Sequence, residues 1–135
     1  MTQEDKKLLL KDLCTRLPYG IKASYYGVEE ECETWDEIEC VTRDGYVDIG
    51  QYSLPIESIK PYLFPLSSMT DEQYNEFFSY YHNIEMAEVK SSGDYLKAAY
   101  IGDDAKYSWL NKNHFDYRGL IEKNLAIDAT NLNIY

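Results

Sequence analysis

The chain has 135 residues, with 13 Lys and Arg against 24 Asp and Glu, and therefore a net charge of -11. This charge disfavours direct binding to the phosphate backbone of nucleic acid or to an anionic membrane surface, because both need clustered basic side chains. The length is typical of one domain, so we expect a single domain over residues 1–135.

The sequence contains no apolar run near the ~18 residues that a membrane span requires. Its start is acidic and lacks the basic and apolar parts of a signal peptide, so we expect a cytoplasmic protein without membrane contact. Cys14, Cys32 and Cys40 are odd in number and irregularly spaced, which is typical of reduced thiols. Cys14 lies among apolar helix residues, and we expect it to be buried.

The first expected element is a helix over residues 3–16. Thr2 and Asp5 form a capping-box pattern, with Asp in the usual Glu or Gln position. Apolar side chains follow at helical spacing, at Leu9, Leu10, Leu13 and Leu17. Pro18 ends the helix because it cannot continue the hydrogen-bonding pattern.

A strand is expected over residues 21–27, with Ile21, Ala23 and Tyr25 on its buried face. Residues 29–39 then carry seven acids and no base. We interpret the first part of this stretch as a solvated loop or hairpin tip.

Asp44-Gly45 is the strongest hairpin signal in the chain. A two-residue turn there pairs Arg43 with Tyr46, Cys40 with Ile49, and Ile38 with Gln51. This register places one set of side chains toward the core and an acidic set toward water. The first set is Ile38, Cys40, Thr42, Val47 and Ile49, and the second is Glu37, Glu39, Tyr46 and Asp48.

Prolines at positions 55, 61 and 65 predict an extended segment over residues 53–66, with one helical turn around residues 56–59. Thr70 and Gln73 then form a capping box that begins a helix over residues 70–81. Its aromatic side chains recur at helical spacing and are expected in the core. They are Tyr74, Phe77, Phe78 and Tyr81.

Residues 84–101 are compatible with a second hairpin or with a helix. A helix is expected over residues 104–114, begun by residues 102–104, with Ala105, Trp109 and Leu110 inward. Asp116 is expected to cap a short second helix containing Leu120, Ile121 and Leu125. The predicted fold class is therefore α+β: a small antiparallel sheet, open or curled into a half-open barrel, flanked by an N-terminal helix, a central helix and a C-terminal helical pair.

Three blocks of the sequence carry a family resemblance. They are residues 2–14 with 17–20, residues 59–70, and residues 112–130, which include HFDYRGLI at 114–121 and LAIDA at 125–129. In these blocks the chain resembles a family of small uncharacterised proteins encoded in bacterial prophages and mobile elements. Residues 25–48 and 84–104 match no block of that family. The resemblance implies an accessory protein of a phage or mobile element and brings no catalytic residues with it.

His114, Asp116 and Arg118 are the densest group of chemically capable side chains. Asp116 and His114 could form a general-base pair only if this stretch is a turn, because residues two apart do not face one another on a helix. A structural interpretation is simpler: Asp116 caps the following helix, Arg118 pairs with an acid, and His114 closes the preceding helix, where a cation is favoured.

No catalytic Cys–His pair, zinc spacing, calcium loop or phosphate-binding loop is evident in the sequence, so we expect no metal, no cofactor and no enzymatic activity. The 14 tyrosines are expected at the margin of the core or on a contact surface, and a contact surface would meet a protein partner or a second copy. Aromatic residues flanking the acidic loops are Tyr19, Tyr25, Tyr26, Trp35, Tyr46 and Tyr52. The candidate binding residues are Trp35, Tyr46, His114, Asp116, Tyr117 and Arg118.

Two alternatives remain open. The acidic surface could imitate nucleic acid and inhibit a host DNA- or RNA-binding protein, or the chain could be a small enzyme with its site at residues 114–118. Affinity that collapses with salt favours the first alternative over an aromatic-anchored contact. A pocket with perturbed ionisable groups favours the second.

Overall fold

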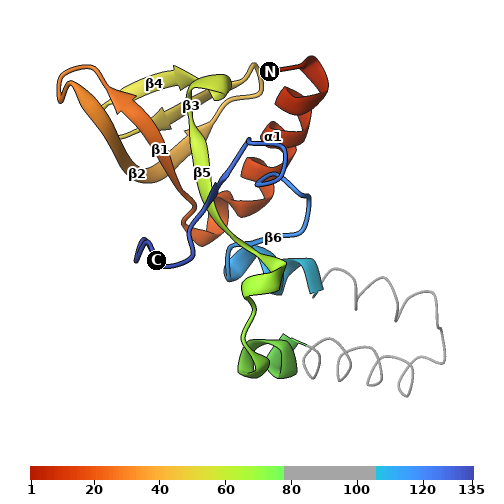
Figure 1. Ribbon diagram of the computed structural model, residues 1–135. Coiled ribbons are helices and arrows are strands. Elements are labelled where there is room, and N and C mark those ends of the chain that lie inside the picture. The colour runs from red at the N-terminus through yellow and green to blue at the C-terminus, as the bar shows by residue number, and fades with distance from the viewer. Residues whose placement is uncertain (78–105) are drawn as a thin grey trace.

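The computed structural model describes residues 1–77 and 106–135 (Figure 1). The chain begins with helix α1 (Gln3–Arg16), followed by the strands β1 (Lys22–Gly27), β2 (Cys32–Val41), β3 (Tyr46–Ile49), β4 (Tyr52–Pro55) and β5 (Lys60–Pro65). Short 3-10 turns lie at Leu17–Tyr19, Ile56–Ser58 and Leu66–Ser68, and the last strands are β6 (Phe115–Asp116) and β7 (Ile127–Asp128). Residues 71–77 and 106–112 are helical. The predicted α+β class is confirmed.

The sheet is curled but not closed, with the strand order β4-β3-β2-β1-β5-β6. Strand β2 pairs with two different neighbours along its length: residues 32–37 pair with β1, and residues 38–41 pair with β3. Strand β5 returns beside β1, and the 3-10 turn Ile56–Ser58 separates it from β4. The one-turn helix predicted around residues 56–59 and the extended chain on both sides of it are confirmed.

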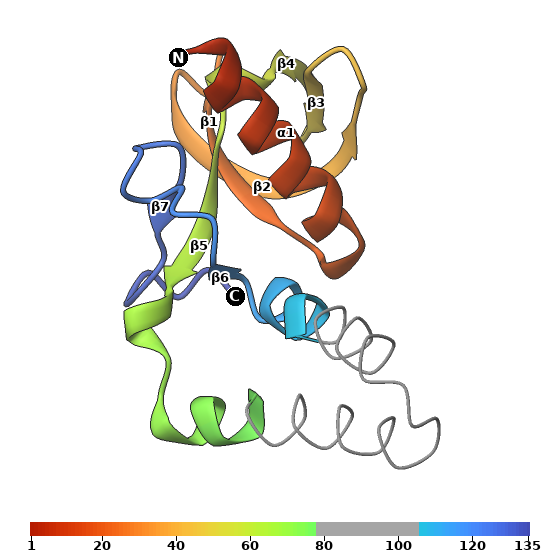
Figure 2. The same cartoon turned by 90° about the vertical axis from the view of Figure 1, so that its right-hand side faces the viewer.

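Helix α1 packs against the curled sheet, and its apolar stripe meets the buried face of the strands (Figure 2). The capping box between Thr2 and Asp5 forms as predicted, and the helix ends at Arg16, before the 3-10 turn Leu17–Tyr19 that contains Pro18. The core contains Leu9, Leu13, Ile21, Ala23, Tyr25, Ile38, Val47, Ile49, Ile56, Ile59, Leu63, Leu120, Leu125 and Ala126. Each large apolar side chain buried there contributes about 1.5–3 kcal/mol of transfer free energy.

The Asp44-Gly45 hairpin is present, but its predicted register is wrong. Gly45 N–H donates to the Thr42 carbonyl, and Thr42 N–H donates to the Tyr46 carbonyl, which makes a three-residue loop. Gly45 has φ 91°, the left-handed conformation that closes such a loop. Because the loop has three residues instead of two, Arg43 does not pair with Tyr46, and Val41 pairs with Val47.

An irregularity between Ile38 and Cys40 then shifts the pairing again, so that Cys40 lies opposite Asp48 and Ile38 opposite Ile49. A bulge of this kind inserts one residue and reverses which side chains face the core. Ile38, Val47 and Ile49 are therefore buried as predicted, whereas Cys40 is exposed and Thr42 is only half-buried. The expected burial of Cys14 is also wrong, because it lies on the outer face of α1.

The C-terminal segment differs most from the prediction. Residues 117–126 form successive turns instead of a second helix, so the predicted helical pair is incomplete. Gly119 and Asn124 have left-handed φ values of 74° and 60°, which interrupt helical geometry. The segment instead supplies β6 and β7, both parallel to β5, so the sheet is mixed and not purely antiparallel.

The two helical stretches beside the sheet agree with the sequence in part. Thr70 and Gln73 form the expected capping box, and Trp109 and Leu110 pack with Phe115 in a second cluster. Phe77 is partly buried against this cluster, but Tyr74 is exposed. The predictions for Phe78, Tyr81, residues 84–101, the cap at 102–104 and Ala105 lie outside the described residues.

The exposed positions of Cys14, Cys32 and Cys40 predict that all three thiols react in the folded protein. We expect three equivalents of a water-soluble disulfide reagent to be consumed without denaturant. The stoichiometry is read by absorbance and by intact mass. If Cys40 alone did not react with the reagent, the outward position of Cys40 on β2 would be contradicted. The same assay in urea provides the total thiol count.

Candidate functional site

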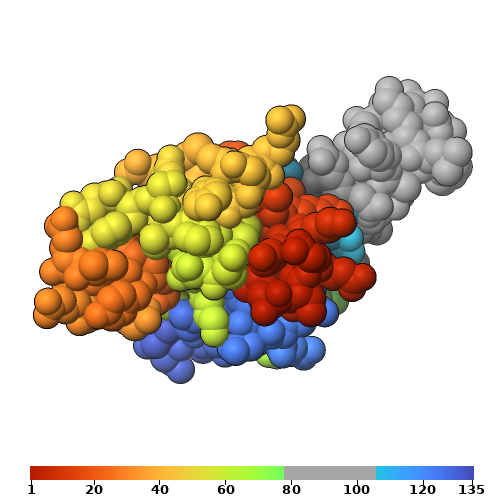
Figure 3. Space-filling model, turned by 90° about the horizontal axis from the view of Figure 1, so that it is seen from above, coloured from red at the N-terminus to blue at the C-terminus, as the bar shows by residue number. Residues whose placement is uncertain are grey.

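A buried ionic cluster joins α1 to the C-terminal segment. Asp12 and Arg16 are both 0% exposed. One Asp12 carboxylate oxygen accepts from Arg16 Nε at 2.8 Å, and the other accepts from Arg118 Nη1 at 2.6 Å. Arg16 Nη2 also donates to the Phe115 carbonyl at 2.6 Å, so the helix is tied to β6. In Figure 3, α1 (red) borders both the strands (yellow-green) and the C-terminal segment (blue).

Tyr117 lies against both guanidinium groups of the cluster. Its ring centroid is 5.1 Å from Arg16 Cζ and 4.6 Å from Arg118 Cζ, which are cation–π distances. Its hydroxyl donates to Asn111 Oδ1 at 2.7 Å. Arg118 thus pairs with an acid, as the structural interpretation of the sequence expected.

His114 makes no hydrogen bond to this cluster among the described residues. Its ring stacks on Tyr135 with 3.6 Å between centroids, and its Nδ1 is buried with no hydrogen-bond partner among the described residues. Burial, followed by the charges of Arg16 and Lys22, lowers the pKa of His114 from 6.5 to about 4. His114 does close the helical stretch, since its N–H donates to the Asn111 carbonyl, but it does so as a neutral ring instead of the expected cation.

Asp116 is a capping residue, although the element it caps is a turn. Its two carboxylate oxygens accept from the N–H groups of Leu120 and Ile121 at 3.0 and 2.9 Å. Within the described residues no hydrogen bond joins it to His114, because its carboxylate is used by these two N–H groups and the His114 ring stacks on Tyr135 instead. The orienting contact that general-base catalysis by this pair needs is therefore not formed.

Tyr135 connects His114 to Trp35. The Tyr135 hydroxyl accepts from Lys22 N–H and donates to the Tyr62 carbonyl, both at 2.9 Å. Burial raises the pKa of this hydroxyl. Lys22 Nζ lies 5.2 Å from the Trp35 ring centroid and 5.5 Å from that of Tyr135. Trp35 and His114, far apart in sequence, are thus linked through Lys22 and Tyr135.

Trp35 also belongs to an exposed aromatic surface on β1 and β2. Strand pairing places Ser24 opposite Trp35 and Tyr26 opposite Glu33, so Tyr26 and Trp35 are diagonal neighbours on the outer face. Tyr26 is 52% exposed and Trp35 45%. We call this surface the Trp35 face and define it as Lys22, Ser24, Tyr26, Glu33, Trp35 and Glu37.

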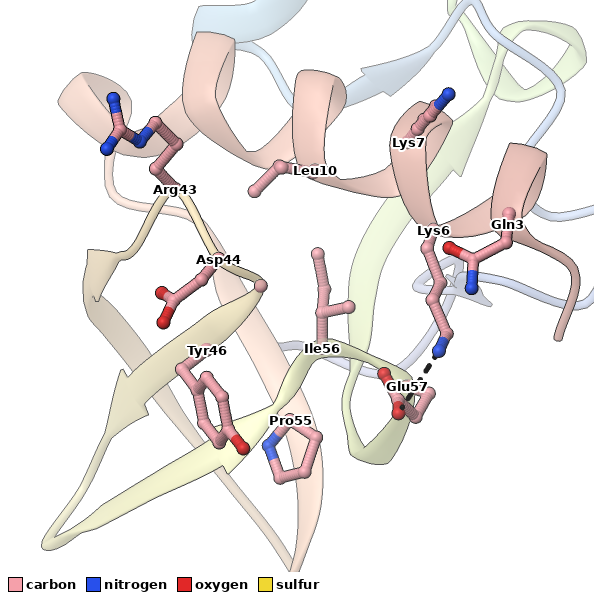
Figure 4. A pocket seen from close by; sticks show the side chains of 11 residues that line it. Gln3, Lys6, Lys7, Leu10, Arg43, Asp44, Tyr46, Pro55, Ile56 and Glu57 are labelled. Atoms are coloured by element: carbon pink, nitrogen blue, oxygen red, sulfur yellow. Dashed lines mark ion pairs between the residues drawn. The ribbon is translucent and has the colours of Figure 1, made fainter.

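Tyr46 lies elsewhere, at an open cavity of about 340 Å³ between α1 and the β3–β4 hairpin (Figure 4). Leu10 and Ile56 supply apolar surface from opposite sides, and Lys6 pairs with Glu57 at 3.5 Å. Figure 4 shows Lys7 and Arg43 projecting away from the cavity. The basic side chains around it therefore do not converge on one point.

The sequence interpretation missed Asp12, Arg16 and Tyr135 as organising residues. Asp12 and Arg16 share the helical stripe of Leu9 and Leu13, at positions i+3 and i+7 from Leu9. Two opposite charges at i,i+4 on an apolar stripe indicate a buried ion pair, so this signal was present. Tyr135 gives no comparable signal, because its partners at Lys22 and Tyr62 are distant in sequence.

Searches for similar proteins found no matching family model, curated protein or solved structure. Within residues 1–77 and 106–135, no three His, Cys, Asp or Glu side chains are placed to hold a metal ion. The described helices are too short or too polar to span a bilayer.

Asp12→Asn is expected to destabilise the protein by about 3–5 kcal/mol, because the near-isosteric amide leaves two guanidinium groups without their counter-ion. The free energy of unfolding is measured by urea titration. Glu4→Gln is the matched control, since it removes one acid from the exposed first turn of the same helix. A loss below about 1 kcal/mol, the range of an exposed ion pair, would contradict the role given to Asp12.

The stability of the protein is expected to depend on His114 below neutral pH. The unfolded chain binds a proton at this ring near pH 6.5, whereas the folded chain resists it until about pH 4. The stability contributed by the neutral ring is therefore complete above about pH 6.5 and is lost as the pH falls toward 4. We expect a loss of about 1–2 kcal/mol, discounted from full linkage because the ring is partly solvent-exposed.

His114→Asn tests this pH dependence, because Asn also accepts the left-handed backbone of position 114, where φ is 63°. Urea midpoints at pH 7.5, 5.5 and 4.5 should fall less steeply for the variant than for the parent protein. Parallel curves for the two proteins would show that His114 titrates normally.

Proposed function

We propose that this chain is a non-enzymatic protein-interaction module whose contact surface is the Trp35 face. The main observation that supports this proposal is that two large aromatic side chains, Tyr26 and Trp35, lie exposed next to each other on paired strands. Neither is needed to fill the core, whose members on β1 are Ala23 and Tyr25. Exposed Trp and Tyr at the centre of a surface are the usual anchors of protein interfaces.

The charges around these rings indicate the chemistry of the partner. Glu33 and Glu37 flank Trp35 along β2, and the acidic tip at residues 29–31 lies beyond Tyr26. Lys22 contacts the Trp35 ring from the other strand. A partner with an apolar patch bordered by Lys or Arg would complement this arrangement and would be repelled least by a chain of charge -11.

The structure supports an aromatic-anchored contact better than nucleic-acid mimicry. Part of the acidic tip is engaged within the chain: Tyr52 donates to Glu30 at 2.9 Å, and Gln51 donates to Glu29 at 2.9 Å. These carboxylates are positioned against β4 instead of forming a regular phosphate-like row. The resemblance to prophage-encoded proteins is consistent with a host protein as the partner and with a cytoplasmic location, and we include both in the proposal.

The double variant Tyr26→Ser, Trp35→Ser is expected to lose its partner. Tagged parent and variant proteins are used for capture from host lysate at low and high salt, and bound proteins are identified by mass spectrometry. A protein retained by the parent at both salt concentrations and lost by the variant supports the proposal, because aromatic contacts are weakly screened. Sedimentation of the purified parent and variant proteins tests whether the partner is a second copy of the chain. Self-association of the parent that is lost in the variant would support this.

The matched control is Tyr19→Ser, Tyr46→Ser, which removes two aromatic side chains that are also exposed but lie outside the Trp35 face. It should bind like the parent. Equal binding by the Tyr26/Trp35 variant would refute the proposed surface. Retention limited to nucleic-acid-binding proteins at low salt would favour mimicry instead.

A further inference from the structure

A second open cavity, of about 530 Å³, lies beside the buried ionic cluster. The described residues that line it come from α1, from the helical stretch 106–112 and from the turn after β6. They are Lys11, Thr15, Tyr107, Ser108, Asn111, Tyr117 and Arg118. None of them is a carboxylate, although acids outnumber bases by 24 to 13 in the chain.

The ionic cluster behind this cavity has an excess of positive charge. Among residues 1–77 and 106–135, Asp12 is the one carboxylate that pairs with Arg16 and Arg118, so in this part of the chain two guanidinium groups share a single negative charge. Arg118 makes its hydrogen bonds within the described residues through Nη1, to Asp12 and Thr15. Its Nε and Nη2 are left as donors on a side chain that the ion pair and the Tyr117 ring hold in place.

Asn111 is the second donor, and its orientation is fixed. The residue is only 6% exposed and lines the cavity. Its Oδ1 accepts from the Tyr117 hydroxyl at 2.7 Å, which leaves its NH₂ group without a partner among the described residues. The side chain is nearly buried but its NH₂ nitrogen is not among the buried unpartnered atoms, so this donor is open to an acceptor-rich ligand at the cavity wall. Lys11, from the exposed side of α1, adds a mobile positive charge at the same cavity.

Two aromatic rings complete the wall. Tyr107 and Tyr117 have ring centroids 5.0 Å apart, and both also line a neighbouring cavity of about 650 Å³. That cavity is mainly apolar and includes Leu66, Met69, Phe77 and Leu110. Donors on one side and apolar surface on the other favour a ligand with a charged head and an apolar body.

We propose that this cavity binds a small organic oxyanion, a phosphate monoester or carboxylate attached to an apolar or aromatic group. The anionic head contacts Arg118, Asn111 and Lys11. The apolar body lies against Tyr107 and Tyr117. This site is separate from the Trp35 face, and neither proposal depends on the other.

The test is an NMR titration of the full chain with phenyl phosphate and, separately, benzoate. Inorganic phosphate and phenol are titrated as controls, because the first represents the anionic head of the ligand alone and the second its aromatic body alone. We expect shifts at amides of residues 106–118 and an affinity for phenyl phosphate or benzoate at least about tenfold above that for either half, because both halves of the cavity contribute. Absence of saturable binding at millimolar concentration, or equal affinity for a half ligand, would overturn the proposal.

Two variants test whether the proposed donors bind the ligand. Both keep Arg118, because this residue also stabilises the fold. Lys11→Gln is expected to weaken binding about three- to tenfold, the effect of one partly screened charge. Asn111→Asp keeps the acceptor for the Tyr117 hydroxyl but replaces the free NH₂ with a negative oxygen, and it should abolish binding. Lys7→Gln is the control, because it removes the same charge from α1 at the other cavity. Unchanged affinity in the first two variants would also overturn the proposal.

Discussion

Asp12 is the residue on which the arrangement of the two ends of this chain depends. A carboxylate with no exposed surface is unfavourable unless it is paired, and Asp12 is paired twice, by Arg16 of its own helix and by Arg118 from the C-terminal segment. Arg16 in turn holds the carbonyl of Phe115. Without this charge, the buried guanidinium group of Arg16 and the partly buried one of Arg118 would share the contact with Tyr117 with no counter-ion between them. The same cluster that fixes α1 on the sheet therefore also determines the walls and the charge of the polar cavity beside it.

Much of the fold follows from local pattern. The capping boxes at Thr2 and Thr70, the end of α1 before Pro18 and the inward faces of α1 and β1 all formed as the sequence predicts. These features depend on residues within one or two turns of one another, where spacing and capping chemistry determine the outcome. The Asp44-Gly45 turn also formed, but local pattern could not distinguish a loop of two residues from one of three. That extra residue turned Cys40 outward, and the bulge between Ile38 and Cys40 returned Ile38 to the core.

The C-terminal segment could not be predicted because its structure comes from distant partners. Strands β6 and β7 have two residues each, too few to show a period, and they exist because β5 offers them a parallel edge. The contacts of the candidate residues also depend on partners that are distant in sequence. The sequence correctly suggested structural roles for Asp116 and Arg118, but the partner of Arg118 lies 106 positions away. His114 looked like a helix-closing cation, and only its stacking on Tyr135 beside two basic groups shows that it is neutral.

The pairing of β5 with β6 has a consequence for where the chain re-enters the sheet. Phe64 and Phe115 are ladder partners, so the chain that runs between them leaves the sheet and re-enters it at the same place. The described ends of this excursion are held by the second cluster, in which Trp109 and Leu110 pack on Phe115 and Phe77 lies against them. The place where the chain re-enters the sheet is therefore fixed by aromatic packing outside the sheet as well as by the ladder itself.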